Sequence, residues 1–362
     1  MKLTIVAGAR PNFMKIAPLI HEIEHVKGNG ADISYRLVHT GQHYDPKLSH
    51  VFFNELGIPE PHVNLEVGSG TQAEQTAGIM IGFEKELMQY KTDLVIVVGD
   101  VTSTMACSIV AKKLNTKVAH IEAGIRSFDL EMPEEINRML TDAIADYFFT
   151  TTEWANENLR KAGIPDNRIF LVGNIMIDTL LKNEPRFEKP ELFSAHHLEE
   201  GNYMVMTLHR PSNVDDPAHL ENLLQAIIEN SNGVPLIFPV HPRTKNTLEK
   251  INFNSDKVIL AEPLSYLKFN YLVKHAKAVI TDSGGIQEET TVMGVPCITM
   301  RNNTERPETV SIGSNILIGS SIDALKNALG VLFKGEWKKG GIPQLWDGNT
   351  AGRIVEVLLH LS

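Results

Sequence analysis

A run of small residues at the end of an apolar stretch has the composition of a phosphate-binding turn. The run is Asp-Ser-Gly-Gly, it ends at Gly285, and the strand-like residues Ala278–Thr281 precede it. With Ser283 as the N-cap of the next helix, Gly284 and Gly285 would let an anion reach backbone N–H groups where the helix dipole favours negative charge. Glu289, about a turn and a half further on, would then reach ribose hydroxyls. An ordinary capped helix after a buried strand is the alternative, so the other motifs have to decide.

Three carboxylates in the first half follow predicted strands or begin a predicted helix. Asp100 comes directly after a glycine that ends an apolar run, Glu122 ends the next apolar run, and Glu134 stands beside a proline at a helix start. Each one alone could be a helix cap or part of a local ion pair. Three carboxylates that converge on one cleft exceed what such structural roles require, and carboxylate pairs with different pKa values commonly supply the acid and the base of a proton transfer. The cluster therefore indicates proton-transfer chemistry.

Basic side chains and histidines stand at other strand ends. Arg10 and Lys15 follow the first apolar run, and such a pair suits a diphosphate. In the second half, His209 follows a strand-like run shortly before a helix-breaking proline, and His241 and Arg243 repeat this arrangement one strand later. Solvated side chains, or histidines that bond to the local backbone, are the alternative for each of these residues taken singly.

The composition excludes several classes of protein. The chain has 362 residues and a net charge of −10 at pH 7, which argues against general binding to nucleic acid or to an anionic membrane surface. No apolar run approaches the roughly 20 residues of a membrane span. The two cysteines, Cys107 and Cys297, stand far apart in apolar sequence, as expected for core residues in a reducing compartment. We therefore expect a cytoplasmic protein.

The sequence indicates neither a metal nor an organic cofactor. Its candidate acids and histidines are spread over different predicted loops and form no specific metal-binding pattern, and there is no Cys-x₂-Cys pair. The turn that begins at Gly8 lacks the second and third glycines of the dinucleotide fingerprint.

Short β-branched runs alternate with longer segments of helical period from end to end. The expected strands are Leu3–Ala7, Tyr35–Thr40, Leu94–Gly99, Val118–Glu122, Tyr147–Thr150, Met204–Leu208, Leu236–Val240, Val258–Leu260, Ala278–Thr281 and Cys297–Thr299. Nearly continuous apolar strands separated by helices are typical of parallel sheets that are covered on both faces. The predicted fold class is therefore α/β, with doubly wound sheets.

The chain is long enough for two domains. The polar stretch 182–201 has two prolines and little periodicity, so we predict a linker there. The N-terminal domain is then 1–181 and the C-terminal domain 202–350, and the final helix 351–362 could pack on either domain. In doubly wound sheets ligands bind beyond the carboxyl ends of the strands, so we expect them in the cleft between the two domains.

Together, these motifs resemble those of the UDP-N-acetylglucosamine 2-epimerase family of the non-hydrolysing type, in the family's order and approximate spacing over nearly the whole chain. The family has a glycosyltransferase-B-type pair of Rossmann-like domains. The motifs are Gly8-Ala-Arg-Pro, Gly41-Gln-His-Tyr, Gly99-Asp, His120-Ile-Glu-Ala-Gly-Ile-Arg, Pro133-Glu-Glu-Ile-Asn-Arg, His209-Arg, His241-Pro-Arg and Asp282-Ser-Gly-Gly-Ile-Gln-Glu-Glu.

The resemblance implies that the final helix 351–362 packs back on the N-terminal domain, and it implies a catalytic set and a UDP-binding set. The catalytic set is Asp100, Glu122, Glu134 and His209. The residues that hold UDP are Arg10, Lys15, His241, Arg243, Ser283, Gly284, Gly285 and Glu289. The implied reaction is the reversible C2 epimerisation of UDP-N-acetylglucosamine to UDP-N-acetylmannosamine by a homodimer, through elimination of UDP to a 2-acetamidoglucal and re-addition. Either Asp100 or Glu134 would remove the C2 proton while Glu122 tunes or relays charge.

Some alternatives stay open. Ser212 and Ala9 depart from the residues common in the family, although neither change removes a proposed catalytic group. The loop 126–133 resembles that of relatives acting on other UDP-2-acetamido sugars, so the sugar is not fixed. A hydrolysing relative would release UDP and N-acetylmannosamine, a glycosyltransferase would need an acceptor site, and a nucleotide-sugar sensor would bind without turnover.

Overall fold

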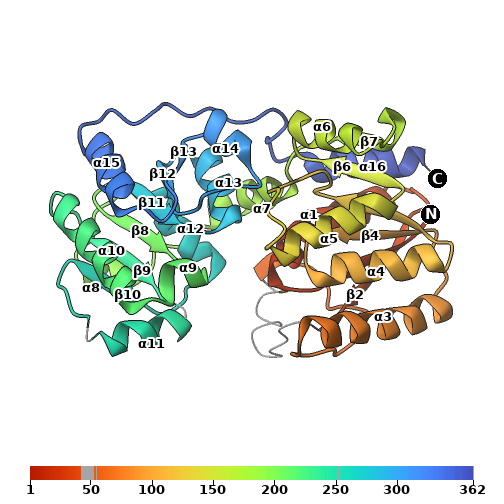
Figure 1. The fold of residues 1–362 in the computed structure, drawn as a ribbon. Coiled ribbons are helices and arrows are strands. Elements are labelled where there is room, and N and C mark those ends of the chain that lie inside the picture. The colour runs from red at the N-terminus through yellow and green to blue at the C-terminus, as the bar shows by residue number, and fades with distance from the viewer. Residues whose placement is uncertain (42–52, 54, 241, 252, 362) are drawn as a thin grey trace. The chain divides into compact units, whose positions relative to one another are not determined.

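The chain folds into two compact α/β units in a computed structural model that describes residues 1–41, 53, 55–240, 242–251 and 253–361. The first unit combines Met1–Thr179 with the C-terminal segment Gln344–Ser362, and the second unit is Leu180–Pro343 (Figure 1). Two chain segments therefore pass from one unit to the other.

The first unit is built on a parallel sheet of seven strands in the order β3-β2-β1-β4-β5-β6-β7. Its strands are β1 (Lys2–Ala7), β2 (Ser34–His39), β3 (Val63–Asn64), β4 (Leu94–Val98), β5 (Lys117–Ile121), β6 (Tyr147–Thr150) and β7 (Ile169–Leu171). Its helices are α1 (Arg10–Gly28), α3 (Gln72–Gln89), α4 (Thr102–Lys113), α5 (Pro133–Ile144), α6 (Glu153–Lys161), α7 (Ile175–Asn183), which continues into the second unit, and α16 (Thr350–His360).

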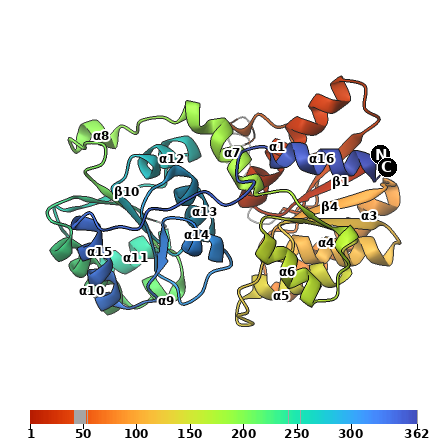
Figure 2. The ribbon, with the colours of Figure 1, turned by 90° about the horizontal axis from the view of Figure 1, so that it is seen from above.

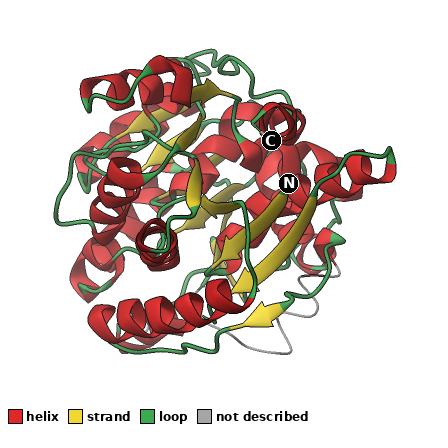
Figure 3. Ribbon diagram, turned by 90° about the vertical axis from the view of Figure 1, so that its right-hand side faces the viewer, coloured by secondary structure: helices red, strands yellow, loops and turns green. Residues whose placement is uncertain are grey.

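Helices cover both faces of this sheet (Figure 3). Every residue of β4, Leu-Val-Ile-Val-Val, is buried, as expected for a central strand covered on both sides. Alternate strand residues such as Val95 and Val97 pack against α3, α4 and α6 in one apolar cluster. On the other face α1 and α16 lie side by side (Figure 2), so both termini are in the first unit.

The C-terminal helix is fixed to the first unit by a cap from a distant helix. The carboxylate of Asp178 in α7 accepts hydrogen bonds from the backbone N–H groups of Thr350 and Ala351, at 3.1 and 2.7 Å. Asn349, at the N-cap position of α16, makes no side-chain cap of its own. Asp178 therefore replaces the local N-cap that α16 lacks.

The second unit is built on a parallel sheet of six strands in the order β10-β9-β8-β11-β12-β13. Its strands are β8 (Met204–Thr207), β9 (Leu236–Pro239), β10 (Val258–Ala261), β11 (Ala278–Thr281), β12 (Cys297–Thr299) and β13 (Asn315–Leu317). Its helices are α8 (Leu192–Ala195), α9 (Pro211–Val214), α10 (Pro217–Asn230), α11 (Pro242–Lys250), α12 (Tyr266–Lys274), α13 (Gly284–Met293), α14 (Pro307–Ser311) and α15 (Ile322–Phe333).

The predicted fold class, α/β with two doubly wound Rossmann-like sheets, is confirmed, and all ten expected strands are present. Three further strands, β3, β7 and β13, were not expected from the sequence, and each has only two or three residues. The stretch 182–201 is part of the second unit rather than a separate linker. Phe193 and Leu198 in this stretch pack into an apolar cluster with Tyr203 and Val205.

Candidate functional site

The polar candidate residues lie near one place in each sheet, which is its switch point. At a switch point, the connections of two neighbouring strands lead in opposite directions along the sheet. In the first sheet this point lies between β1 and β4, and in the second between β8 and β11. Gly99 and Asp100 directly follow β4. In the second unit, His209 follows β8 and Asp282 follows β11. In open parallel sheets ligands bind at the carboxyl edge at this point.

Lys15 and Glu122 form a nearly buried ion pair at the edge of the first sheet. Lys15 lies in α1 and Glu122 follows β5, and the distance from Lys15 Nζ to Glu122 Oε2 is 2.6 Å. Gly99 borders this pair, because a Cβ at Gly99 would lie 3.0 Å from Lys15 Nζ. Glu122 has a positive φ of 68°, which a non-glycine residue rarely adopts. Lys15 was expected to bind diphosphate, but the structure shows it bound to Glu122.

Asp100 is oriented by an arginine from α5. Arg138 Nη1 donates to Asp100 Oδ2 at 2.5 Å, and its Nε and Nη2 donate to Glu135 at 3.0 and 2.6 Å. Glu135 is fully buried and also accepts from the backbone N–H of Ser127 at 2.9 Å. Glu134, on the same first turn of α5, is exposed. Asp100 and Glu122 thus each lie within an ion pair, whereas Glu134 faces solvent.

A buried histidine contacts the backbone of the turn that contains Gly99. His120 on β5 lies 2.8 Å from the carbonyl oxygen of Gly99 through Nε2 and 2.6 Å from Asp142 through Nδ1. Arg126 Nη1 lies 2.6 Å from the other oxygen of Asp142. Burial raises the pKa of Asp142, but His120 and Arg126 outweigh it and hold that pKa below its ordinary value. The backbone that directly precedes Asp100 is therefore held by a buried network of His120, Asp142 and Arg126.

Asp282 organises the edge of the second sheet. Its buried carboxylate accepts from the backbone N–H of Arg210 at 2.9 Å and from Asn213 Nδ2 at 3.0 Å. Its Oδ1 lies 2.7 Å from Nδ1 of His209, whose side chain is 59% exposed. Burial raises the pKa of Asp282, but its hydrogen bonds, that from His209 first, hold the pKa below the ordinary value. Asp282 fixes the His209 ring and leaves its other edge accessible.

The turn from β11 to α13 has the features expected of an anion site, with one correction. Ser283 is the N-cap residue, but its side chain makes no cap hydrogen bond. Gly284 and Gly285 begin the helix without positive φ, so backbone conformation does not require glycine there. A Cβ at Gly285 would meet nothing within 4 Å. The glycines therefore leave space at a helix N-terminus, where N–H groups have no intrahelical partner.

Glu289 lies further along α13 in a buried position. Its Oε1 accepts from the hydroxyl of Tyr266 at 3.2 Å. Burial raises the pKa of Glu289 to about 7, and the Tyr266 hydrogen bond only partly opposes this shift. A carboxyl group with this pKa can donate or accept hydrogen bonds near neutral pH.

The side chains of three predicted binding residues lie outside the part of the chain that the structure describes. His241 lies outside the described residues, as do residues 42–44 of the Gly41-Gln-His-Tyr motif. Arg10 is the first residue of α1 and Arg243 lies in α11, and only their backbone positions are described.

Asp282, Glu135 and Arg138 lie in these clusters but were not predicted from the sequence as site residues. Asp282 follows an apolar strand directly, as Asp100 nearly does, so the same signal was available for it. Glu135 and Arg138 stand three residues apart, which puts them on one helix face, but nothing local shows that this face meets Asp100.

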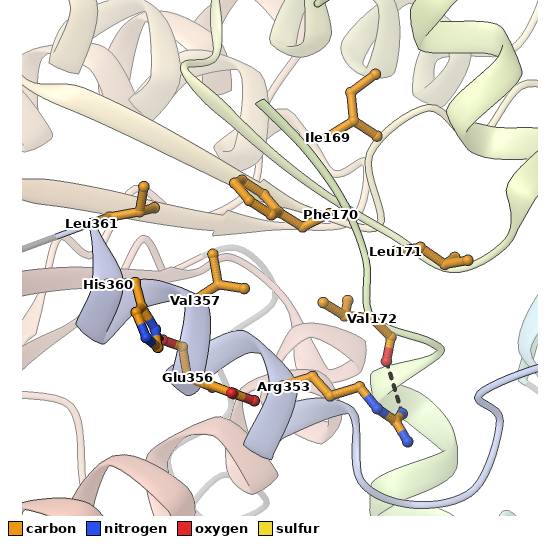
Figure 4. A pocket seen from close by; sticks show the side chains of 9 residues that line it. All are labelled: Ile169, Phe170, Leu171, Val172, Arg353, Glu356, Val357, His360 and Leu361. Carbon is orange, nitrogen blue, oxygen red and sulfur yellow. Dashed lines mark hydrogen bonds between the residues drawn. The ribbon is translucent and has the colours of Figure 1, made fainter. Parts of the chain in front are cut away.

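Over the described ranges, no helix is long and apolar enough to cross a membrane, and no group of three or more His, Cys, Asp or Glu side chains could hold a metal ion. A groove of about 520 Å³ lies between β7 and α16 and is lined by residues including Phe170, Val357 and His360 (Figure 4). None of the predicted site residues lines it.

The fold defines an α/β protein of two doubly wound units, with a polar cluster at the switch point of each sheet, which is where open parallel sheets bind their ligands. The family model described as UDP-N-acetylglucosamine 2-epimerase matches residues 26–359. The chain therefore belongs to the UDP-N-acetylglucosamine 2-epimerase family, and the resemblance drawn from its motifs is confirmed.

Individual relatives are similar over their whole length. A UDP-N-acetylglucosamine 2-epimerase of Methanocaldococcus jannaschii is 42% identical, with 99% of both chains covered. The crystal structure of the epimerase of that organism in complex with UDP-GlcNAc and UDP matches with a TM-score of 0.86 over 99% of this chain and 100% of that chain, at 42% identity. A UDP-2,3-diacetamido-2,3-dideoxy-D-glucuronate 2-epimerase of Pseudomonas aeruginosa is 35% identical, with 100% of both chains covered.

Proposed function

We propose that this protein catalyses the reversible C2 epimerisation of UDP-N-acetylglucosamine to UDP-N-acetylmannosamine without a cofactor. The observation that carries the proposal is the pair of oriented carboxylates, Asp100 and Glu122, at the switch point of the first sheet. Membership of the family and similarity to an epimerase crystallised with UDP-GlcNAc and UDP support the choice of substrate.

The chemistry explains why carboxylates and a phosphate site are both needed. The C2 proton has no neighbouring carbonyl group, so its acidity is very low until the C1–O bond to UDP loosens. Cleavage of that bond gives an oxocarbenium-like centre, and loss of the C2 proton then yields a 2-acetamidoglucal with UDP still bound. Return of a proton to the opposite face and re-addition of UDP give the epimer. Two acid–base positions are therefore required.

Asp100, Glu122 and Glu134 are the proposed acid–base groups of the first unit. Among these groups, Asp100 has a fixed orientation. The guanidinium of Arg138 bonds to one oxygen of the Asp100 carboxylate and leaves the other oxygen for substrate. Glu134 is exposed, so it has freedom to reorient when substrate binds. Lys15 serves Glu122 in this scheme rather than the diphosphate.

The second unit is proposed to hold UDP. The N–H groups at the start of α13, with Ser283, Gly284 and Gly285, would receive the phosphates, and Glu289 would bond to the ribose. His209 would approach the β-phosphate, where charge develops as the C1–O bond breaks. Arg10, His241 and Arg243 complete the proposed UDP-binding set.

Proton NMR in deuterated water tests the proposed function. The protein is incubated with UDP-N-acetylglucosamine, and we expect the C2 proton signal to disappear while UDP-N-acetylmannosamine accumulates as an intact nucleotide sugar. Free N-acetylmannosamine and UDP would instead identify the hydrolysing reaction. Because one relative acts on a diacetamido glucuronate, that UDP-sugar is the second substrate to test. An unchanged C2 signal with both sugars would reject the proposal.

We also propose that the protein is a homodimer. Large apolar side chains are exposed on α3 and α5, the two helices that flank α4 (Figure 1). They are Ile81, Met88, Ile136, Met139 and Leu140. An apolar face of this kind favours burial against a second copy. A cytoplasmic location is proposed because both cysteines are free and buried.

A further inference from the structure

A buried glutamine connects the proposed phosphate turn to two other segments of the second unit. Gln287 lies in α13 and is fully buried. Its Nε2 donates to the carbonyl oxygen of Ser283 at 3.1 Å. Its Oε1 accepts from the hydroxyl of Thr304 at 2.8 Å and from Asn315 Nδ2 at 3.1 Å. The amide thus uses both of its ends inside the unit.

The backbone of Ser283 is held at both its N–H and its carbonyl group. The Ser283 N–H donates to the hydroxyl of Thr281 at 3.0 Å, while Gln287 holds the carbonyl. Because the Ser283 carbonyl and the Gly284 N–H belong to the same planar peptide group, holding the carbonyl also fixes the direction of that N–H. A preorganised turn of this kind avoids the cost of ordering donors when an anion binds.

The loop that borders the turn is held by the same amide. The hydroxyl of Thr304 donates to Gln287 and accepts from the backbone N–H of Arg306 at 3.0 Å. Within this loop Glu305 comes close to the turn, because a Cβ at Gly284 would lie 3.9 Å from Glu305 Oε2. A shift of the loop would therefore move a carboxylate relative to the proposed phosphate site.

We propose that Gln287 is a positioning residue, which aims the first N–H groups of α13 at the diphosphate and keeps the 301–306 loop at its distance from them. The proposal rests on the proposed function, since it assigns a role within the UDP site. Gln287 itself makes no contact with the nucleotide in this proposal, because it is fully buried and its amide bonds to Ser283, Thr304 and Asn315.

The test compares the binding of UDP and of uridine by calorimetry or ligand-observed NMR. Gln287→Leu removes the amide, and we expect the Kd for UDP to rise about tenfold, the effect of one lost hydrogen-bonded contact. The Kd for uridine should stay within about twofold, because uridine has no phosphate for the turn to bind. A general destabilisation of the second unit would instead raise the Kd for UDP and the Kd for uridine to a similar extent.

Milder variants keep the proposal testable if Gln287→Leu does not fold. Thr304→Val removes the hydroxyl that donates to Gln287 from the loop, and it should weaken the binding of UDP but not that of uridine. Thr304→Ser keeps a hydroxyl and should therefore have the wild-type Kd for UDP. Thr290→Val is the matched control on the same helix, because the Thr290 hydroxyl donates to the carbonyls of Ile286 and Gln287. UDP binding should not respond to it.

The outcomes separate the two proposals. If the wild-type protein binds no UDP, the proposed function itself is wrong. If the wild type binds UDP and both Gln287→Leu and Thr304→Val retain its Kd within about twofold, the positioning role is overturned. An equal loss of UDP and uridine affinity in these variants would also overturn it, since that result indicates a structural role alone.

Discussion

Glu305 and Glu308 are both buried in the second unit, yet their pKa values move in opposite directions. For both, burial disfavours the ionised form. Arg301 donates to both oxygens of Glu305 at 2.8 Å and outweighs burial, so the pKa of Glu305 falls to about 2. Among the described residues neither oxygen of Glu308 has a hydrogen-bond partner, and burial raises its pKa to about 7. The partner, more than the depth of burial, decides the direction.

Glu308 should make the protein less stable as the pH rises. Below the unfolded pKa of about 4.5 the carboxyl group is protonated in both states, and between about 4.5 and 7 only the folded state retains the proton. Stability is therefore lost over that window, by roughly 3 kcal/mol when complete. Glu308→Gln should lack this loss. Urea unfolding of both proteins at pH 5 and pH 8 measures the difference.

A wild-type protein and a Glu308→Gln variant with the same pH dependence between 5 and 8 would contradict this prediction. Glu305 does not contribute to the change in stability between pH 5 and pH 8, because its pKa is lowered. Its stabilising contribution is complete above about pH 4.5 and is lost only as the pH falls toward about 2.

Lys15→Met should destabilise the first unit. The substitution leaves Glu122, whose side chain is 2% exposed, without the cation at 2.6 Å. Removing one partner of a buried ion pair costs about 3–5 kcal/mol. The double variant Lys15→Met/Glu122→Gln removes the charge as well and should regain part of the loss. Unfolding midpoints in urea report both effects, and a Lys15→Met midpoint equal to that of the wild type would refute the prediction.

At the scale of elements, the turn between β4 and α4 is closely surrounded by side chains of the first candidate site. Gly99 has a φ of 69°, and Lys15, Glu122 and Asn12 all lie within 4 Å of where its Cβ would be. Asn12 Nδ2 donates to the carbonyl of Val98 at 2.9 Å, which ties the start of α1 to the end of β4. The turn therefore depends on glycine for its backbone and for its free space.

Gly99→Ala should lower both stability and activity. The left-handed backbone costs roughly 1–2 kcal/mol, and the new Cβ would lie 3.0 Å from Lys15 Nζ, which its bond to Glu122 holds in place. We expect C2 exchange to slow by about 10- to 100-fold, as for other small displacements of acid–base groups. Urea unfolding and the NMR exchange rate are measured together.

Gly163→Ala separates the two effects of Gly99→Ala. Gly163 also has a positive φ, of 86°, but a Cβ there would meet nothing within 4 Å. This control should lose a similar amount of stability and retain its exchange rate. Full exchange activity in Gly99→Ala would show that the Lys15–Glu122 pair tolerates the added methyl group.

At the scale of the whole molecule, the exposed apolar side chains are unevenly distributed. In the first unit five of them lie on α3 and α5, and Met88 is 69% exposed. In the second unit Ile342 is similarly apolar and 55% exposed, but it lies in the connection that leads back to the first unit. This distribution is the basis of the proposed dimer.

Met88→Asp should convert the proposed dimer to a monomer, because it places a charge in the apolar contact. Sedimentation velocity should give twice the mass of the chain for the wild type and a single chain for the variant. Ile342→Asp makes the same change outside the α3–α5 face and should remain dimeric. A wild-type protein that sediments as one chain would reject the dimer, and a dimeric Met88→Asp would reject this face as its interface.

The sequence by itself determined the fold class and placed the candidate site residues at the ends of strands. Apolar runs such as Leu94–Val98 and Ala278–Thr281 are buried on both faces in the structure, so their composition alone defined central parallel strands. Polar residues directly after such runs must lie at the carboxyl edge of a sheet. For that reason Asp100, Glu122 and His209 could be selected from local sequence.

Only the tertiary structure decided what each of these side chains contacts. Lys15 and Glu122 are far apart in the chain and come within 2.6 Å because α1 and β5 meet at the same sheet edge. Arg138 in α5 reaches Asp100, and Asp178 in α7 caps α16, through contacts between elements that are likewise separated in the sequence. Local propensity and period depend on near neighbours, whereas these contacts depend on how the sheet orders its strands, which no short stretch of sequence encodes.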